Sequence, residues 1–481
     1  MFDPVPWLIL LPLSWATLAF VQGPGRGGRL ALVGLALQIA LGVTLAQQIV
    51  SGGARLLAVG GWGAPLGIDL AVDGLSMVML LLTPGVALPL AFYARAYFAE
   101  HAGSQRYFWP LTGYLLAAMN ALFLSADVFN IYVTLELLSL AAVGLLALPG
   151  GAGPISAAMR YLLATLLGSA AYLLGVALLY GVYGSVSLPV LSSLILVDAP
   201  LAVSLAAALM LLGLMLKTAL FPFHFWLPPA HGGAPAPVSA LLSALVIKAS
   251  FYLILRLWFD VFAPITSAAT AQLVGALGAG AVLWGSLLAL RQTQLKMLVA
   301  YSTVAQVGYL FLLLPLATGT SAAVTTSAWQ GGVLHVVAHG LAKAAMFAAV
   351  GAMIAATGRN EIAGIAGVAT RLPLTLFSFA LAGVTIMGLP PSGGFAAKWL
   401  LLGAALASGQ WWWIAVMVAG GLLSAAYVFK VLRQAFLPAE ATSDFKVLPR
   451  MLEWPPFLLA LASLLLGLTA GELVLPLLDA P

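Results

Sequence analysis

The sequence predicts an all-α integral membrane protein of about fourteen transmembrane helices, and two observations support this. First, 63% of the residues are hydrophobic and only 7% are charged, with a mean hydropathy of +1.10. A soluble domain carries about 25% charged residues, so this chain cannot cover its surface with polar side chains. Second, its apolar runs are close to the ~20 residues that one membrane helix needs. Strands of a membrane barrel would instead alternate apolar and polar residues over about ten positions.

The predicted spans follow one another along the whole chain. They cover residues 5–22, 30–50, 75–94, 107–125, 128–148, 159–183, 201–221, 234–257, 270–290, 297–316, 328–356, 373–407, 411–434 and 455–478. The run 373–407 is too long for one straight span and contains GLPPSGG, so it is predicted to be one discontinuous helix. The N-terminal stretch lacks a basic region before its apolar run, which favours a first membrane helix over a cleavable signal peptide.

Basic residues outside the spans predict the orientation of the chain. Only Arg55 and Arg256 fall at even-numbered loops. Thirteen others lie at or near odd-numbered loops: Arg26, Arg29, Arg95, Arg106, Arg160, Arg291, Lys296, Arg359, Arg371, Lys430, Arg433, Lys446 and Arg450. Cytoplasmic loops of membrane proteins are enriched in lysine and arginine. The odd-numbered loops are therefore predicted to be cytoplasmic, and both termini to lie outside the cytoplasm.

Composition also excludes several classes of function. The chain has no cysteine, which excludes thiolate-ligated iron–sulfur clusters, disulfides and cysteine nucleophiles. The net charge of +5 is scattered over short loops, so no nucleic-acid partner is predicted. The stretch GPGRGG at 23–28 has no surrounding βαβ unit and is predicted to be a loop. Ser302 and Ser392 have no plausible histidine and aspartate partners for a catalytic triad.

Five ionisable side chains are predicted to lie inside the membrane. They are Glu136, Lys217, Lys248, Lys343 and Lys398. A charge at the bilayer centre costs about 2.5–3.5 kcal/mol on insertion scales, and such residues usually mark ion pathways. Glu136 and Lys217 could form a buried ion pair that only holds the fold, but three lysines would then lack an acidic partner. The pattern therefore favours a pathway along which lysines exchange protons.

A second polar pattern lies in VLHVVAHGLAKAAMFAAVG. His335, His339 and Lys343 recur every four residues, so they share one helical face. Lysine is a poor metal ligand and no nearby carboxylate completes a set, so no metal is predicted. Two histidines one turn apart cannot ligate opposite faces of a haem, and no cofactor is predicted. Histidine titrates near physiological pH, which favours a proton relay.

Two proline- and glycine-rich breaks flank two of the intramembrane lysines. Pro222, Pro228 and Pro229 follow Lys217, and Pro390, Pro391, Gly393 and Gly394 precede Lys398. Interrupted membrane helices are tolerated where they line a cavity, and paired ones often mark inverted repeats. Lys217 precedes Lys248 by 31 residues, and Lys398 precedes Lys430 by 32. Unrelated proline kinks are the alternative to discontinuous helices 7 and 12 in two inverted repeats.

At these positions the sequence resembles the antiporter-like subunits shared by respiratory complex I, membrane-bound hydrogenases and multisubunit Mrp-type Na⁺/H⁺ antiporters. The matching blocks, between about 125 and 405, are VFNIYVTLELLSL, LKTALFPFHFWLPPAHGGAPAPVSALLS, LRQTQLKMLVAYSTVAQVGYL, LHVVAHGLAKAAMF and GLPPSGGFAAKWLL. The resemblance implies N-terminal helices 1–3 over 1–106, a first repeat (helices 4–8) over 107–257, a second repeat (helices 9–13) over 270–434, and helix 14 over 455–478.

The resemblance also implies roles for single residues. Glu136 and Lys217 match the pair at the channel entrance, and Lys248 matches the central relay lysine. His335, His339 and Lys343 match the later relay, and Lys398 occupies the terminal position. Gln306 stands where many relatives carry histidine and some Mrp-type subunits carry glutamine. The segment GGWGAPLGIDLAVDGLSMVMLLLT is most similar to the Mrp D-type chain.

The expected function is that of a proton-translocating subunit, without redox chemistry of its own, in a multisubunit Na⁺/H⁺ antiporter of the Mrp D type. The alternative is a proton-pumping membrane subunit of a complex I-like NADH-quinone oxidoreductase or a membrane-bound hydrogenase. A stand-alone solute symporter ranks below both. The expected partners are other membrane subunits, protons, Na⁺ as a candidate second ion, and the lipid bilayer. The expected location is the inner membrane of a bacterium or archaeon.

Overall fold

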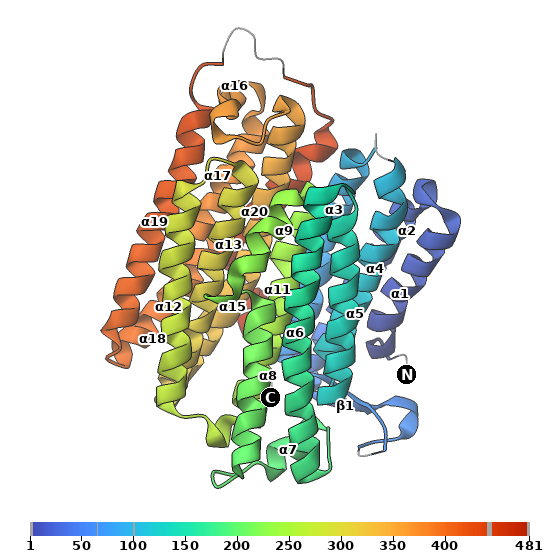
Figure 1. The fold of residues 1–481 in the computed structure, drawn as a ribbon, viewed down its shortest axis with the longest axis vertical. Helices are drawn as coiled ribbons and strands as arrows, with labels where there is room; N and C mark the ends of the chain where they lie inside the picture. The colour runs from blue at the N-terminus through green and yellow to red at the C-terminus, as the bar shows by residue number, and fades with distance from the viewer. Residues whose placement is uncertain (1–2, 65, 100–101, 440–444, 479–481) are drawn as a thin grey trace.

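The computed structural model describes residues 3–64, 66–99, 102–439 and 445–478. Most of the described residues are helical, and the long helices stand side by side in an elongated bundle (Figure 1). The first long helices are α1 (Val5–Gln22), α2 (Pro24–Gly52), α3 (Gly74–Tyr97), α4 (Ala102–Leu124), α5 (Val128–Ala147), α6 (Ala152–Tyr183) and α8 (Leu201–Thr218). Later ones are α12 (Ala268–Arg291), α13 (Leu295–Phe311), α15 (Ala322–Thr357), α19 (Trp411–Ala435) and α20 (Trp454–Leu473).

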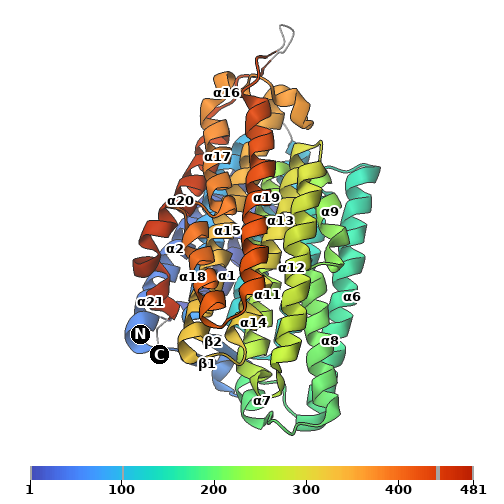
Figure 2. The same ribbon diagram turned by 90° about the vertical axis from the view of Figure 1, so that its left-hand side faces the viewer.

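Fourteen crossings are present in the described part of the chain, as the sequence predicted. Thirteen helical segments are long and apolar enough to span a bilayer. The remaining crossing is built from two shorter helices, α17 (Pro373–Met387) and α18 (Gly393–Ala407), which together replace the long run 373–407. The last described helix, α21 (Leu475–Leu478), lies at the same end of the bundle as the start of α1, as an even number of crossings requires (Figure 2). Residues 1–2 and 479–481 lie outside the described residues.

Several helices begin earlier than the apolar runs that predicted them. The helix α2 starts at Pro24 and α6 at Ala152, each at least six residues before the predicted span. Hydropathy shows only where the apolar residues begin. A helix can begin earlier, among polar residues or glycines, wherever its backbone forms intrahelical hydrogen bonds. In α2 a proline occupies the first turn, where its missing N–H costs no hydrogen bond.

A small antiparallel sheet at one end of the bundle was not predicted. The strands β1 (Arg55–Ala58) and β2 (Asp69–Val72) pair with Arg55 opposite Val72. Isolated bridges join Leu70 to Ser125 and Asp127 to Ser187, so β2 and the starts of α5 and α7 (Leu188–Leu194) meet at this end. The prediction of an all-α chain is therefore correct for the membrane region, and the exception lies in the loop between α2 and α3.

The first predicted break separates α8 from the rest of helix 7. The backbone turns left-handed at Ala219 (φ 58°), and Pro222 follows. Two short elements, η2 (Phe223–Trp226) and α9 (Leu227–Gly233), complete the crossing, with Pro228 and Pro229 in the first turn of α9. The indole N–H of Trp226 donates to the Leu216 carbonyl at 2.9 Å. The same carbonyl accepts from the Ala219 N–H at 3.2 Å, so both bonds hold the end of α8.

The second predicted break lies between α17 and α18. The helix α17 ends at Gly388 (φ 81°), Pro390 and Pro391 form the connection, and the side chain of Ser392 caps the first turn of α18. A Cβ atom on Gly394 would lie 1.9 Å from the Thr385 carbonyl oxygen, so only glycine fits there. The close approach of α18 to the end of α17 therefore requires this glycine.

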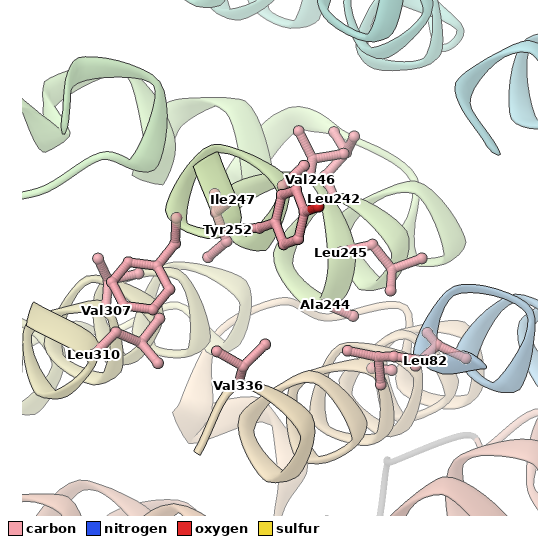
Figure 3. Close-up of a cluster of buried hydrophobic side chains, with 14 of the residues drawn as sticks. Leu82, Leu242, Ala244, Leu245, Val246, Ile247, Tyr252, Val307, Leu310 and Val336 are labelled. Atoms are coloured by element: carbon pink, nitrogen blue, oxygen red, sulfur yellow. The ribbon is translucent and has the colours of Figure 1, made fainter. Parts of the chain in front are cut away.

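The centre of the bundle is formed by helix 8 and α15. Helix 8 comprises α10 (Ala236–Leu241), the π-helical η3 (Leu242–Val246), α11 (Ile247–Arg256) and the π-helical η4 (Leu257–Val261). In the most apolar stretch of helix 8, 100% of the residues are buried inside the protein, and in that of α15, 94% are buried. In α1 and α19 the buried share is only 33%. Figure 3 shows Leu245 of η3, Leu310 of α13, Val336 of α15 and Leu82 of α3 packed in this core.

Candidate ion-translocation site

The predicted pair Glu136 and Lys217 comes together between α5 and the end of α8. The Lys217 Nζ lies 3.6 Å from Glu136 Oε1 and donates to Ser139 Oγ at 2.9 Å. Ser139 is three residues after Glu136, so both side chains lie on one face of α5. The ammonium is therefore held by a hydroxyl and, more loosely, by a carboxylate.

Two glycines bring Lys217 close to α6. A Cβ atom on Gly213 would lie 2.2 Å from the Gly168 carbonyl oxygen, and one on Gly168 would lie 2.7 Å from the Gly213 carbonyl oxygen. The helices α6 and α8 therefore touch backbone to backbone at this level. A Cβ atom on Gly168 would also lie 3.3 Å from Lys217 Cγ, so the lysine stem packs directly against α6.

Lys248 lies fully buried in α11, directly after the π-helical segment η3. Its ammonium donates to the backbone carbonyl of Ser243, five residues earlier and inside that segment. Single π-helical turns are rare and are frequent at functional sites. A buried cation needs polar partners, and here a backbone carbonyl of its own helix supplies one where no carboxylate does.

The predicted stripe on α15 is present and fully buried. The rings of His335 and His339 are stacked, with centroids 5.8 Å apart and planes at 17°. Neither ring has a hydrogen-bond partner for its nitrogens among the described residues. One turn further, Lys343 donates to the Val299 carbonyl at 3.1 Å and to the hydroxyl of Ser302, both on α13. The stripe thus faces α13 through Lys343.

Lys398 lies where helix 12 is broken. Its Nζ donates to the Ile386 carbonyl at 2.8 Å, lies 3.5 Å from the Met387 carbonyl, and sits 4.2 Å from the centroid of the Tyr309 ring. The C-terminal end of a helix carries partial negative charge, which favours a cation there. An aromatic face favours one as well. The ring of Tyr309 also lies 5.7 Å from that of His335, so it bridges Lys398 to the α15 stripe.

The seven predicted ion-pathway residues thus occupy three neighbouring positions in the bundle. Glu136 and Lys217 form the first, and Lys398 at the second break forms the last. The central position holds Lys248, His335, His339 and Lys343. A hydrogen bond of 3.0 Å from Thr218 to Ser250 joins the helix of Lys217 to that of Lys248. Within the described residues, no hydrogen bond directly links two of the four lysines.

Several partners of these lysines were not predicted from the sequence. The spacing of Ser139 from Glu136 was a signal that could have identified it. Ser302 was considered only as a nucleophile and rejected, and it instead accepts from Lys343. Nothing in the sequence pointed to Tyr309 under Lys398, because its role depends on how α13 packs against α18.

Two basic residues assigned to loops make specific bonds at helix ends. Lys296, in the first turn of α13, donates to the Ala234 carbonyl at 2.8 Å. Lys430 donates to the carbonyls of Leu290 and Gln292, at 2.8 and 2.6 Å, and so caps the end of α12. The sequence spacing made Lys430 the counterpart of Lys248, but it is half-buried near a helix end rather than in the bundle centre.

The two arginines at even-numbered loops are both paired with acids. Arg55 lies 3.6 Å from Asp3, and Arg256 forms ion pairs with Asp73 and, at 3.2 Å, with Asp260. Asp73 also caps α3 by accepting from the Ser76 N–H at 2.9 Å. Burial raises the pKa of the Asp73 carboxyl, but Arg256 and Ser76 outweigh it, so this pKa lies below its ordinary value. Both exceptions to the charge asymmetry are thus ion-paired locally.

Comparisons with known proteins identify the family. Residues 125–424 match the model described as NADH:quinone oxidoreductase/Mrp antiporter, TM, and residues 59–108 match complex I chain 5 N-terminus. The chain is 36% identical to NADH-quinone oxidoreductase subunit N of Desulforudis audaxviator, covering 89% of this chain and 86% of the relative. It is 29% identical to the D-type chain of the Na⁺/H⁺ antiporter of Bacillus subtilis, covering 92% and 89%.

A solved structure of the Mrp complex from Dietzia contains a chain with the same fold. The TM-score is 0.88 at 26% sequence identity, and the match covers 99% of this chain and 96% of that one. The family model alone covers more than half of the sequence, from the start of α5 to Ser424 in α19. The match thus includes all seven residues predicted to form the ion pathway. This multi-pass membrane protein belongs to the NADH:quinone oxidoreductase/Mrp antiporter transmembrane family.

Proposed function

We propose that this chain is the proton-translocating, D-type subunit of a multisubunit Na⁺/H⁺ antiporter, and that it has no redox chemistry of its own. One observation carries the proposal: four buried lysines cross the bundle, and only Lys217 has a carboxylate partner among the described residues. Ion pairs that merely hold a fold would need one acid for each lysine. Lysines held by carbonyls and hydroxyls can instead take up and release protons.

Proton transfer begins at Glu136 and Lys217 in this proposal. A nearby carboxylate stabilises the protonated lysine. Their 3.6 Å separation leaves the carboxylate free to move while Ser139 keeps the ammonium in place. When Glu136 moves away, Lys217 loses that stabilisation and passes its proton towards Lys248.

The central residues then carry the proton to the second break. A neutral imidazole has one donating and one accepting nitrogen, so the stacked rings of His335 and His339 can accept and pass on protons carried by mobile water. In the transfer sequence Lys248 and Lys343 precede these rings on the side of His339, and Lys398 follows on the side of His335. Lys398 is the last carrier, and the ring of Tyr309 lies between it and His335 while mobile water carries the proton.

Inverted repeats are the proposed origin of the two breaks. In both, an intramembrane lysine adjoins a helix end that turns left-handed, at Ala219 after Lys217 and at Gly388 before Lys398. Repeats over 107–257 and 270–434 would place these lysines at similar depths in opposite half-channels. Because most basic loop residues lie in odd-numbered loops, we infer that these loops face the cytoplasm.

An Mrp-type assembly with other membrane subunits is the favoured context. The relative in Bacillus subtilis is the D-type chain of an Na⁺/H⁺ antiporter, and the Dietzia structure is an Mrp complex. The second candidate is a proton-pumping subunit of a redox complex. It is favoured by the higher identity, 36%, to an NADH-quinone oxidoreductase subunit N. Neither role requires a cofactor in this chain.

The test has two parts. Purification of the intact complex identifies the partners: several small membrane proteins support the antiporter, and iron–sulfur subunits support the redox enzyme. Na⁺-dependent proton movement is then measured in membrane vesicles that carry Lys217→Ala or the control Lys446→Gln, whose side chain is exposed. We expect loss of proton movement only in Lys217→Ala. Equal activity of both variants would refute the proposed pathway.

A further inference from the structure

A cavity of about 730 Å³ lies away from the proton pathway, between the ends of α12 and α19. The short element η6 (Ile362–Ile365) closes its third side. Its walls are Leu290, Ile362, Ala426, Phe429, Lys430, Leu432, Arg433, Gln434 and Phe436. None of the seven ion-pathway residues lines it. Figure 2 shows α12 and α19 side by side with α16 (Val368–Arg371) beyond their ends.

The cavity lies at the ends of two helices that are long and apolar enough to span a membrane. The two helices end at Arg291 in α12 and at Ala435 in α19, one residue beyond the predicted spans 270–290 and 411–434. Phe429 and Phe436 on its rim are 57% and 71% exposed. Aromatic side chains are enriched at membrane–water boundaries, so these two rings are placed to contact lipid while the rest of the cavity faces the headgroup region.

Among the described residues that line the cavity, the charged side chains are Lys430 and Arg433, both cationic, and the amide of Gln434 is the neutral polar one. Lys430 uses two of its three ammonium protons on the carbonyls of Leu290 and Gln292, which leaves one donor. Arg433 makes no hydrogen bond or ion pair with any described residue, so its five donors remain available. No aspartate or glutamate is among the described residues that line the cavity.

We propose that this cavity binds the phosphate headgroup of an anionic phospholipid. A guanidinium matches phosphate oxygens in a two-point geometry, and Arg433 offers one that has no competing partner among the described residues. Phe429, Leu432 and Phe436 provide an apolar wall for the acyl chains. A zwitterionic lipid carries a cationic amine as well, and no carboxylate is among the described residues that line the cavity to receive it.

The location agrees with this ligand. In the orientation proposed above, this end of the bundle faces the cytoplasm, where the leaflet is enriched in anionic lipids. Basic pockets between membrane helices on that side are suited to such headgroups. A bound lipid would join α19 to α12 and η6, which Lys430 and the bond from Gln434 to the Ala363 carbonyl (3.1 Å) already connect.

The test titrates lipid onto the purified full chain in detergent and follows retention by native mass spectrometry. The probes are phosphatidylglycerol, phosphatidylcholine and inorganic phosphate. The variants are Arg433→Gln and Arg433→Gln with Lys430→Gln. The matched control is Arg371→Gln, which removes an exposed cation at the same end of the bundle but outside the cavity.

We expect tighter retention of phosphatidylglycerol than of phosphatidylcholine, and no displacement by millimolar inorganic phosphate. Each cation near the surface is worth about 1 kcal/mol, so Arg433→Gln should weaken phosphatidylglycerol binding roughly fivefold. The double variant should weaken it further and the control should not. If the double variant fails to fold, Arg433→Gln decides alone, because its side chain makes no bond that the fold needs.

Four results would overturn the proposal. Equal retention of both lipids, or binding unaffected by Arg433→Gln, would show that the cations recognise no headgroup. Displacement by inorganic phosphate would indicate a site for a free anion. In the assembled complex, Phe436→Cys carrying a photoreactive label should cross-link to lipid, and capture of a neighbouring protein instead would make this face a protein interface.

Discussion

The ammonium of Lys217 lies 3.6 Å from the carboxylate of Glu136, in an ion pair looser than a direct hydrogen bond. The same ammonium donates to Ser139 at 2.9 Å, so it stays in place when the carboxylate moves. This arrangement suits a proton carrier, which must be charged at one stage and neutral at another. A pair that only stabilises the fold would gain from the closest possible contact.

Removal of either member of this pair should therefore stop transport while the complex remains assembled. Lys217→Ala removes the carrier, and Glu136→Gln removes the charge that stabilises the protonated lysine. Ser139→Ala should reduce transport by a smaller factor, because Glu136 remains. Proton uptake in vesicles, normalised to assembled complex on native gels, measures all three. Wild-type rates in an assembled Glu136→Gln complex would mean that the pair is structural.

The break in helix 12 should tolerate no side chain at Gly394. A methyl group there would overlap the Thr385 carbonyl oxygen at 1.9 Å, so Gly394→Ala should separate α18 from α17 and abolish stable assembly. The matched control is Gly403→Ala in the same helix, where a Cβ meets nothing within 4 Å. Alanine is favoured over glycine in a helix by about 1 kcal/mol, so the control should be unchanged or slightly more stable. Thermal unfolding in detergent compares the two, and equal midpoints would refute the tight packing of the break.

The ion pair between Asp73 and Arg256 should make stability depend on pH. Arg256 and the Ser76 N–H hold the pKa of Asp73 below its ordinary value, despite burial. The stabilisation is therefore complete above the pKa of an unfolded aspartate, about 3.9, and is lost as the pH falls through the lower folded-state pKa. Asp73→Asn should lower the unfolding midpoint at pH 7, and the difference from the wild type should shrink in acid. If the difference in unfolding midpoint between Asp73→Asn and the wild type stayed constant from pH 7 to pH 3, the ionised Asp73 carboxylate would not be the source of the stabilisation.

The proposed orientation predicts which loops can be labelled from each side. Because the chain has no cysteine, single cysteines can be introduced without background. Val447→Cys lies in the exposed connection between α19 and α20, and Trp62→Cys lies in the exposed loop between β1 and β2 at the other end. In intact cells an impermeant thiol reagent should label Trp62→Cys and spare Val447→Cys. The reverse pattern would show that the proposed topology is inverted, and that each half-channel opens on the opposite side of the membrane from the one assigned.

Much of this fold was predictable because the membrane imposes it. Long apolar runs marked the helices. The prolines after Lys217 and before Lys398 marked both breaks, since proline cannot continue a helix without losing a hydrogen bond. The residue types at the site were also visible, because an ionisable side chain is costly inside an apolar run and is rare there unless it has a function.

The partners that hold those side chains were not predictable in the same way. Ser302 and Tyr309 act on Lys343 and Lys398 only because α13 packs against α15 and α18. The Ser243 carbonyl is available to Lys248 because η3 is π-helical, and no residue in LSALV signals that winding. The pairing of β1 with β2 likewise depends on contacts that hydropathy does not record.

The exchange of lysine for arginine at position 398 tests the central claim most directly. Arginine keeps the positive charge at the end of α17 but stays protonated throughout the physiological range, so it cannot pass a proton on. ΔpH formation is measured in everted vesicles from pH 7 to 9 for Lys398→Arg, Lys398→Ala and Lys398→Gln at matched expression and confirmed assembly. We predict that Lys398→Arg fails as completely as Lys398→Ala. Strong activity of the arginine variant would contradict the proton-carrier role, because Lys398 would then supply only a fixed charge.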